Sequence, residues 1–181
     1  MSAAAAHSAR APIFKPQGTA LEGGALSLTY DADRDGWSPE AFHAAVDGRG
    51  PAIAVALTAT GEILGGYNPA GWQGQGQEVA SDEAYLFFFP ENGDLPVRLP
   101  KVGGPGEAVF RDEPKQGLWF GRDGLVVPLS PGSERAVKSK LGAYYSRKPD
   151  GARHLISDGV PVKGGSRGCL LASLHVWTAA A

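Results

Sequence analysis

Residues 52–67 read AIAVALTATGEILGGY, and this stretch predicts two paired β-strands. In Ala52–Thr58 large aliphatic residues alternate with alanine, so both faces are apolar and we expect the strand at the centre of a sheet. Thr60-Gly61 is a turn signal, and Glu62–Tyr67 can pair back as the second strand of a hairpin. The Gly-Gly pair inside that second strand indicates a bulge or a close backbone approach.

Short apolar runs separated by glycine and proline continue along the chain, which contains 26 Gly and 14 Pro. This rhythm is typical of strands joined by turns and predicts a β-dominated (α+β) fold. Because Pro100 cannot donate to a hydrogen-bond ladder, we expect its strand at a sheet edge. The further strands predicted are Ala84–Phe89, Val97–Val102, Glu107–Arg111, a hairpin of Leu118–Phe120 with Leu125–Leu129, and Cys169–Thr178.

Two short helices are predicted. Ser38 can cap the first, Trp37 and Phe42 have the spacing of a hydrophobic staple, and Gly48 can end it in a left-handed conformation. The second is predicted within Ser133–Ser146, where apolar residues recur at helical spacing.

Composition excludes several classes of protein. The 181 residues suit one domain, and a net charge of −2 with scattered Lys and Arg argues against a nucleic-acid partner. No apolar run is long enough to span a bilayer, so direct membrane insertion is not expected. The single cysteine, Cys169, cannot form an internal disulfide, and a reducing, cytoplasmic location is the default.

The expected domain organisation is simple. Residues 1–23 are predicted to be a disordered Ala-rich tail, 24–178 a single domain, and 179–181 a C-terminal tail. The N-terminal 15 residues lack an apolar segment, which argues against a secretory signal. They contain Ala, Ser and Arg but no acid, so targeting to an organelle is an alternative to a cytoplasmic location.

Two motifs come close to known sites without completing them. Asp31, Asp33 and Asp35 match the start of a calcium loop, but its twelfth position, where a bidentate Glu is needed, is Phe42. Ser166 lies in a G-x-S-x-G pattern, but no Asp or Glu follows it, so the chain order of a nucleophile elbow fails. No catalytic, cofactor-binding or metal-binding residues are therefore assigned, and no cofactor is expected.

The histidines and the cysteine favour ordinary structural roles. None of the four histidines forms an evident ligand pair with another His, Cys or acid, and His43 is expected to be a partly exposed surface residue. Cys169 is flanked by two leucines in a predicted strand, so inert packing is expected.

A series of markers runs along the chain: Asp35-Gly36-Trp37-Ser38, Phe42-His43, Asp47-Gly48, Gly50-Pro51, Gly65-Gly66-Tyr67, Trp72, Ser81–Phe88, Gly117–Gly121 and Leu174–Trp177. In this order the markers resemble the TLDc domain family, over about Gly24 to Trp177. The segment from Pro131 to Gly165 has no clear counterpart, and His175 stands where the family has an acid.

The resemblance implies a two-sheet antiparallel β-sandwich with a few short helices. It also implies a role in oxidation resistance and in regulating the vacuolar-type proton ATPase by direct binding, and no agreed catalytic residues come with it. The expected function is therefore non-catalytic protein binding. An enzyme or direct antioxidant with an unrecognised active site, and a scaffold module, are the alternatives.

The candidate partner surface is the polar loop Gly71–Glu83. Trp72 is the candidate anchor, and Glu78, Asp82 and Glu83 could steer a basic partner. An equally weighted alternative places Trp72 over the sheet edge as a packing residue. In that case the contact surface is expected elsewhere, for example within Pro131 to Gly165.

Overall fold

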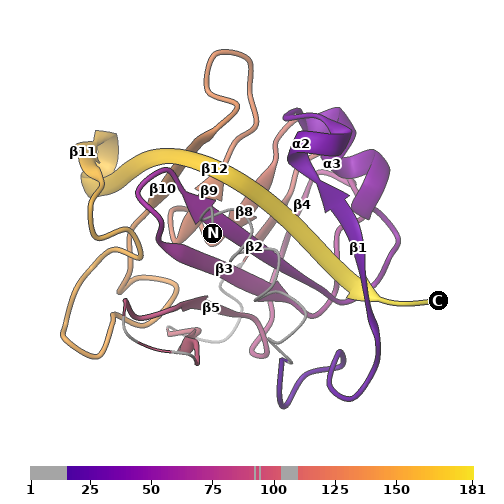
Figure 1. Ribbon diagram of the computed structural model, residues 1–181, viewed down its shortest axis with the longest axis horizontal. Helices are drawn as coiled ribbons and strands as arrows, with labels where there is room; N and C mark the ends of the chain where they lie inside the picture. Colours follow the sequence, from indigo (N-terminus) through magenta and orange to yellow (C-terminus); the bar gives the residue numbers. More distant parts are fainter. Residues whose placement is uncertain (1–15, 92, 94, 103–109) are drawn as a thin grey trace.

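The computed structural model describes residues 16–91, 93, 95–102 and 110–181. Every strand pair in this part of the chain is antiparallel. The two α-helices lie together at one end of the molecule (Figure 1). The fold is therefore β-dominated, as predicted. In chain order the elements are β1 (Leu26–Asp31), α2 (Ala32–Asp35), α3 (Pro39–Val46), β2 (Ala52–Thr58), β3 (Ile63–Asn68), β4 (Gln77–Val79), β5 (Tyr85–Phe88), β6 (Val97–Pro100), β7 (Phe110–Asp112), β8 (Leu118–Phe120), β9 (Leu125–Val127), β10 (Ala136–Ser139), β11 (Val160–Val162), η1 (Lys163–Gly165) and β12 (Ser166–Ala179).

The 14-residue strand β12 joins two sheets (Figure 1). Its C-terminal part pairs with β1 on one side and β2 on the other, and β3, β5 and β6 continue in that order from β2 to form the first sheet. Its N-terminal part pairs with β10 and β11, and β9, β8, β7 and β4 follow on; this is the second sheet. The register of β12 against β2 shifts between Leu171 and Ser173, where the strand passes from one sheet to the other.

The main core lies between the two sheets. It combines Ala54, Leu64 and Leu86 of the first sheet with Leu118 and Phe120 of the second. A Cβ atom built on Gly66 would lie 2.7 Å from the Phe120 ring, so only glycine fits at this position. The close approach predicted for the Gly-Gly pair is confirmed, and it lets the sheets pack tightly.

A second cluster covers the outer face of the first sheet. Ile53, Val55, Phe87 and Tyr85 are buried there, and Trp177 packs against them while Leu174 and Val176 face the main core. Leu21 also belongs to this cluster and is 3% exposed. Leu21 therefore packs against the first sheet, although it lies within the segment 1–23 that is predicted as an N-terminal tail.

Most predicted elements are confirmed. The side-chain oxygen of Ser38 accepts a hydrogen bond from Ala41 N at 3.1 Å and caps α3, and the predicted hairpin is present as β8 and β9. The strand with Pro100 ends its sheet. The predicted strand Glu107–Arg111 lies mostly outside the described residues, because 107–109 are not described.

The helix predicted within Ser133–Ser146 is wrong. This segment contains β10 and a series of turns, and burial in β10 alternates, with Val137 and Ser139 buried and the residues beside them partly exposed. Gly142 has φ +100°, a conformation that interrupts any helix. The helical spacing of apolar residues arises because a short strand and two turns each send one of them to the core.

Candidate functional site

Trp72 is a core residue. Its side chain is 0% exposed and makes edge-to-face contacts with Phe42 of α3, at 5.2 Å between ring centroids, and with Phe120 of β8, at 6.2 Å. Its carbonyl oxygen accepts a hydrogen bond from Gly48 N at 2.9 Å. The packing alternative is therefore correct, and Trp72 cannot be the exposed anchor of a partner surface.

Asp112 holds the loop that carries Trp72. Its buried carboxylate accepts hydrogen bonds from the backbone N–H groups of Gln73 and Gly74, both at 2.9 Å, and of Gln75 at 3.4 Å. Gly74 has φ +64°, and a Cβ there would collide with the carboxylate of Asp47. Asp112 is remote from the loop along the chain, so no local motif predicts this contact.

His43 completes the same polar cluster and is 7% exposed, so the prediction that it is a surface residue is wrong. Its Nδ1 lies 2.8 Å from Asp47 Oδ1, and its Nε2 lies 3.0 Å from the carbonyl oxygens of Glu113 and Gln116. Both ring nitrogens therefore face oxygen atoms, and these contacts hold the ring in place within the cluster.

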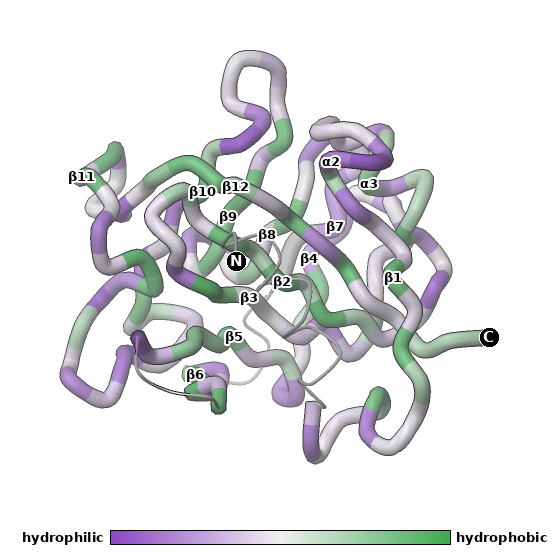
Figure 2. The backbone as a smooth tube through the Cα atoms, in the orientation of Figure 1, coloured by the Kyte–Doolittle hydropathy of each residue, from purple (hydrophilic) through white to green (hydrophobic). Residues whose placement is uncertain are grey.

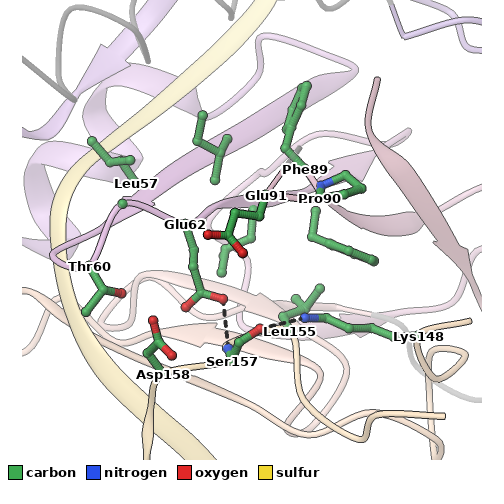
Figure 3. A pocket seen from close by; sticks show the side chains of 14 residues that line it. Leu57, Thr60, Glu62, Phe89, Pro90, Glu91, Lys148, Leu155, Ser157 and Asp158 are labelled. Atoms are coloured by element: carbon green, nitrogen blue, oxygen red, sulfur yellow. Dashed lines mark hydrogen bonds between the residues drawn. The ribbon is translucent and has the colours of Figure 1, made fainter. Parts of the chain in front are cut away.

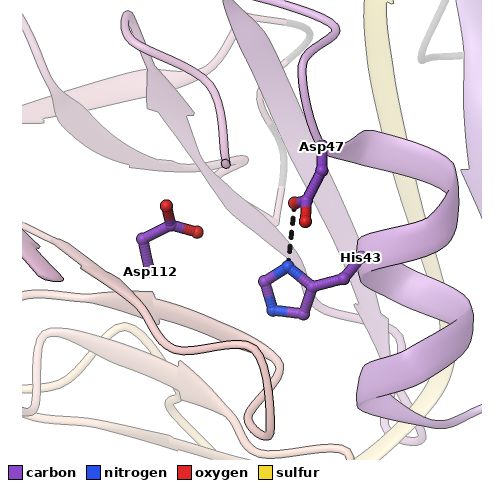
Figure 4. A group of neighbouring side chains, drawn as sticks. All are labelled: His43, Asp47 and Asp112. Carbon is purple, nitrogen blue, oxygen red and sulfur yellow. Dashed lines mark hydrogen bonds and ion pairs between the residues drawn. The ribbon is translucent and has the colours of Figure 1, made fainter. Parts of the chain in front are cut away.

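His43, Asp47 and Asp112 bring their ligand-type atoms within 4.8 Å of one another (Figure 4). A divalent cation between them would have to displace the His43–Asp47 hydrogen bond, and Asp112 is already held by backbone N–H groups. The cluster therefore serves best as a clamp that fastens the loop 71–76 to α3 and β7. We call it the Asp112 clamp.

The three acids of the predicted partner surface are exposed. Glu78 lies on β4 at the end of the second sheet, while Asp82 and Glu83 lie in the connection to β5. Asp82 forms an ion pair with Lys101 at 2.9 Å, which offsets part of its charge. The structure thus separates these acids from Trp72, which faces the core.

An open apolar groove lies on the outer face of the second sheet. It has a volume of about 440 Å³ and is lined by residues of β8 to β12. Three aliphatic side chains stand exposed here: Val160 at 64%, Leu170 at 60% and Val162 at 37%. Figure 2 shows the hydrophobic colouring of β11 and of β12 beside it. The groove residues used below are Trp119, Val126, Lys138, Val160, Val162, Cys169 and Leu170, and we call them the outer groove.

Strand register connects the outer groove to Glu78. Lys138 pairs with Val126, Val126 with Trp119, Trp119 with Arg111, and Arg111 with Glu78. Directly paired residues of an antiparallel sheet project to the same face. The acid and the apolar groove therefore share one face of the second sheet.

Cys169 borders this groove, but it pairs with Val137 and its half-buried side chain packs against the main core on the other face of the sheet. Burial, together with the negative charges of Glu62 and Asp158, raises the pKa of the Cys169 thiol to about 11. The thiolate, which is the reactive form, is therefore scarce at neutral pH.

The incomplete motifs have internal partners. Asp33 accepts hydrogen bonds from Trp37 Nε1 and Arg135 Nη2, both at 2.9 Å, and Asp35 pairs with Arg34 at 2.7 Å. Ser166 is buried at the start of β12, after η1, so it lacks the strand-to-helix turn of a nucleophile elbow. In the part of the chain that the structure describes, no helix has the length and apolar character needed to cross a bilayer.

Comparison with known proteins supports the resemblance seen in the sequence. A search of curated proteins found no match. The TLDc domain family matches residues 15–150, well over half of the chain. The match ends before β11 and β12, so the outer groove combines strands inside and outside the matched stretch. The chain belongs to the TLDc domain family.

Proposed function

We propose that this TLDc domain acts by binding a protein partner through the outer groove, without catalysis. The observation that carries the proposal is the exposure of Val160, Leu170 and Val162 around a single groove. Adjacent exposed aliphatic side chains on a folded domain are typical of protein contact sites, where burial of apolar surface favours binding.

The groove also sets the chemistry of the partner. A segment with apolar side chains would fill the space beside Leu170 and Val160, and a basic group on it would meet Glu78 on the same sheet face. The exposed acids Asp82 and Glu83 would add to the attraction in the encounter. Trp72 takes no part in this contact.

The partner we propose is the vacuolar-type proton ATPase, with a role in resistance to oxidative stress. Membership of the TLDc family supports this choice. A cytoplasmic location is proposed with it, in keeping with a single cysteine. The alternative of a direct thiol antioxidant is disfavoured, because such chemistry needs a thiol of low pKa and burial raises that of Cys169.

The test uses purified vacuolar-type proton ATPase and the full chain. Leu170→Ser removes an exposed groove residue, and Leu95→Ser is its matched control, because Leu95 is 80% exposed outside the groove. We expect Leu170→Ser to weaken binding by at least about tenfold and to reduce any effect on ATP hydrolysis, while Leu95→Ser binds normally. Absence of binding by the wild-type chain, or equal affinity of both variants, would overturn the proposal.

A further inference from the structure

A second cavity, of about 510 Å³, lies between the β2–β3 turn, the end of β5 and the segment 148–158 (Figure 3). Figure 3 shows the carboxylates of Glu62, Glu91 and Asp158 on one side, while the side chain of Lys148 reaches in from the other. Leu57 and Leu155 add apolar wall. The cavity therefore combines an excess of negative charge with an apolar surface.

Glu62 is only half satisfied in this cavity. Its Oε1 accepts a hydrogen bond from Ser157 N at 2.8 Å. Its Oε2 is buried and has no hydrogen-bond partner among the described residues. A buried carboxylate oxygen without a donor leaves the negative charge of Glu62 only partly offset, so this group favours a cation in the adjoining cavity.

Lys148 does not supply that donor. The residue is 9% exposed, its Nζ donates to Ser157 Oγ at 3.2 Å, and it lies 4.5 Å from the centre of the Phe88 ring. Among the described residues no ion pair joins it to a carboxylate. Burial lowers the pKa of Lys148, and the nearby charges of Glu62 and Asp150 oppose this shift. Ser157 thus stands between the ammonium and Glu62.

Charge and shape together select the ligand. Three carboxylates against one ammonium leave the cavity negative, so it favours a cation. A metal ion would need several converging oxygen ligands, but one oxygen of Glu62 is committed to Ser157 and much of the wall is apolar. An amine on an alkyl stem matches both features, since its N–H groups donate and its stem packs against carbon.

We propose that this cavity binds an alkylammonium group, whose charge faces the carboxylate of Glu62 and whose stem lies against Leu57 and Leu155. Asp158 and Glu91 stabilise its charge from the mouth of the cavity. A free small amine and a lysine side chain of another protein offer the same chemistry. The proposal does not depend on binding of the ATPase, because the two cavities lie in different places and are lined by different residues.

The test measures binding of two probes to the full chain by NMR titration. The probes are 1-aminopentane, representing a free amine, and Nα-acetyl-lysine N-methylamide, representing a lysine side chain; 1-pentanol is the uncharged control. Glu62→Gln keeps the acceptor for Ser157 N and removes the charge. Asp158→Asn changes an exposed position, and Glu40→Gln is the control for net charge at an exposed site on α3.

We expect 1-aminopentane to shift resonances of the cavity residues and 1-pentanol to leave them unchanged. Glu62→Gln should weaken amine binding by about tenfold or more, Asp158→Asn by less, and Glu40→Gln not at all. If both probes bind, the cavity accepts a lysine side chain of another protein. If only 1-aminopentane binds, the ligand is a free amine. Failure of both probes, or binding that Glu62→Gln leaves intact, would overturn the proposal.

Discussion

The Trp72 loop and the outer groove differ in how deeply their apolar side chains are buried. In the loop 71–76, the side chain of Trp72 is buried between the helix and the sheets, and the Asp112 clamp occupies the backbone N–H groups. In the groove, Val160 and Leu170 remain exposed although both lie in regular strands. A closed, internally bonded loop indicates a structural role, whereas apolar side chains left exposed on a sheet indicate a contact from outside.

The largest expected effect on stability belongs to the Trp72 loop. Trp72→Ala removes a fully buried indole from the main core and should lower the free energy of unfolding by about 3–5 kcal/mol. Urea denaturation followed by circular dichroism measures this loss. A variant with wild-type stability that fails to bind the partner would reverse the two roles.

The Asp112 clamp should matter next. Asp112→Ala leaves the N–H groups of Gln73 and Gly74 without their acceptor, and we expect a loss of about 1–3 kcal/mol in unfolding free energy. Asp158→Ala, at an exposed position, is the control and should change stability by no more than about 0.5 kcal/mol. Equal stabilities of the two variants would show that the clamp does not fasten the loop.

Beside the open groove, the raised pKa of the Cys169 thiol can be measured. Because the thiolate reacts and the pKa is about 11 instead of 9.0, alkylation by iodoacetamide at pH 8 should be roughly ten- to a hundredfold slower than that of a peptide thiol. The alkylation rate of Cys169 should continue to rise from pH 9 toward pH 11, a range in which the rate for a peptide thiol levels off. A plateau near pH 9 would mean that burial does not perturb the thiol.

The smallest expected effect on stability belongs to the groove itself. Leu170→Ser changes a side chain that is 60% exposed, so the free energy of unfolding should stay within about 0.5 kcal/mol of wild type. Urea denaturation of Leu170→Ser and Trp72→Ala under the same conditions compares their free energies of unfolding directly. A loss as large as that of Trp72→Ala would place Leu170 in the core and remove the basis for an open surface.

Local pattern was sufficient for much of the fold. The alternation in Ala52–Thr58, the Ser38 cap and the Gly65-Gly66 pair each depend on neighbours in sequence, and each prediction is confirmed. The segment 133–146 misled because apolar residues at helical spacing also occur where a short strand is followed by turns. Gly142, whose φ is positive, marks the interruption of a helix in this segment, but a single glycine in a sequence is a weak signal.

The site was less predictable because it depends on contacts distant in sequence. Asp112 reaches the loop 71–76 through the pairing of β7 with β4, two segments that are far apart in sequence. The glycines of that loop were the available signal, since Gly71, Gly74 and Gly76 all adopt positive φ and turn the backbone toward an acceptor. Exposure of Leu170 follows from which sheet face stays uncovered, and that is a property of the whole fold.

Hydroxyl-radical labelling of the chain, alone and bound to vacuolar-type proton ATPase, tests the central claim most directly. In the unbound chain Val160, Leu170 and Leu95 should be labelled and Trp72 should not, following their exposure. In the complex, labelling of Val160 and Leu170 should fall while that of Leu95 persists. Unchanged labelling of Val160 and Leu170 in a formed complex would contradict the assignment of the outer groove as the binding surface.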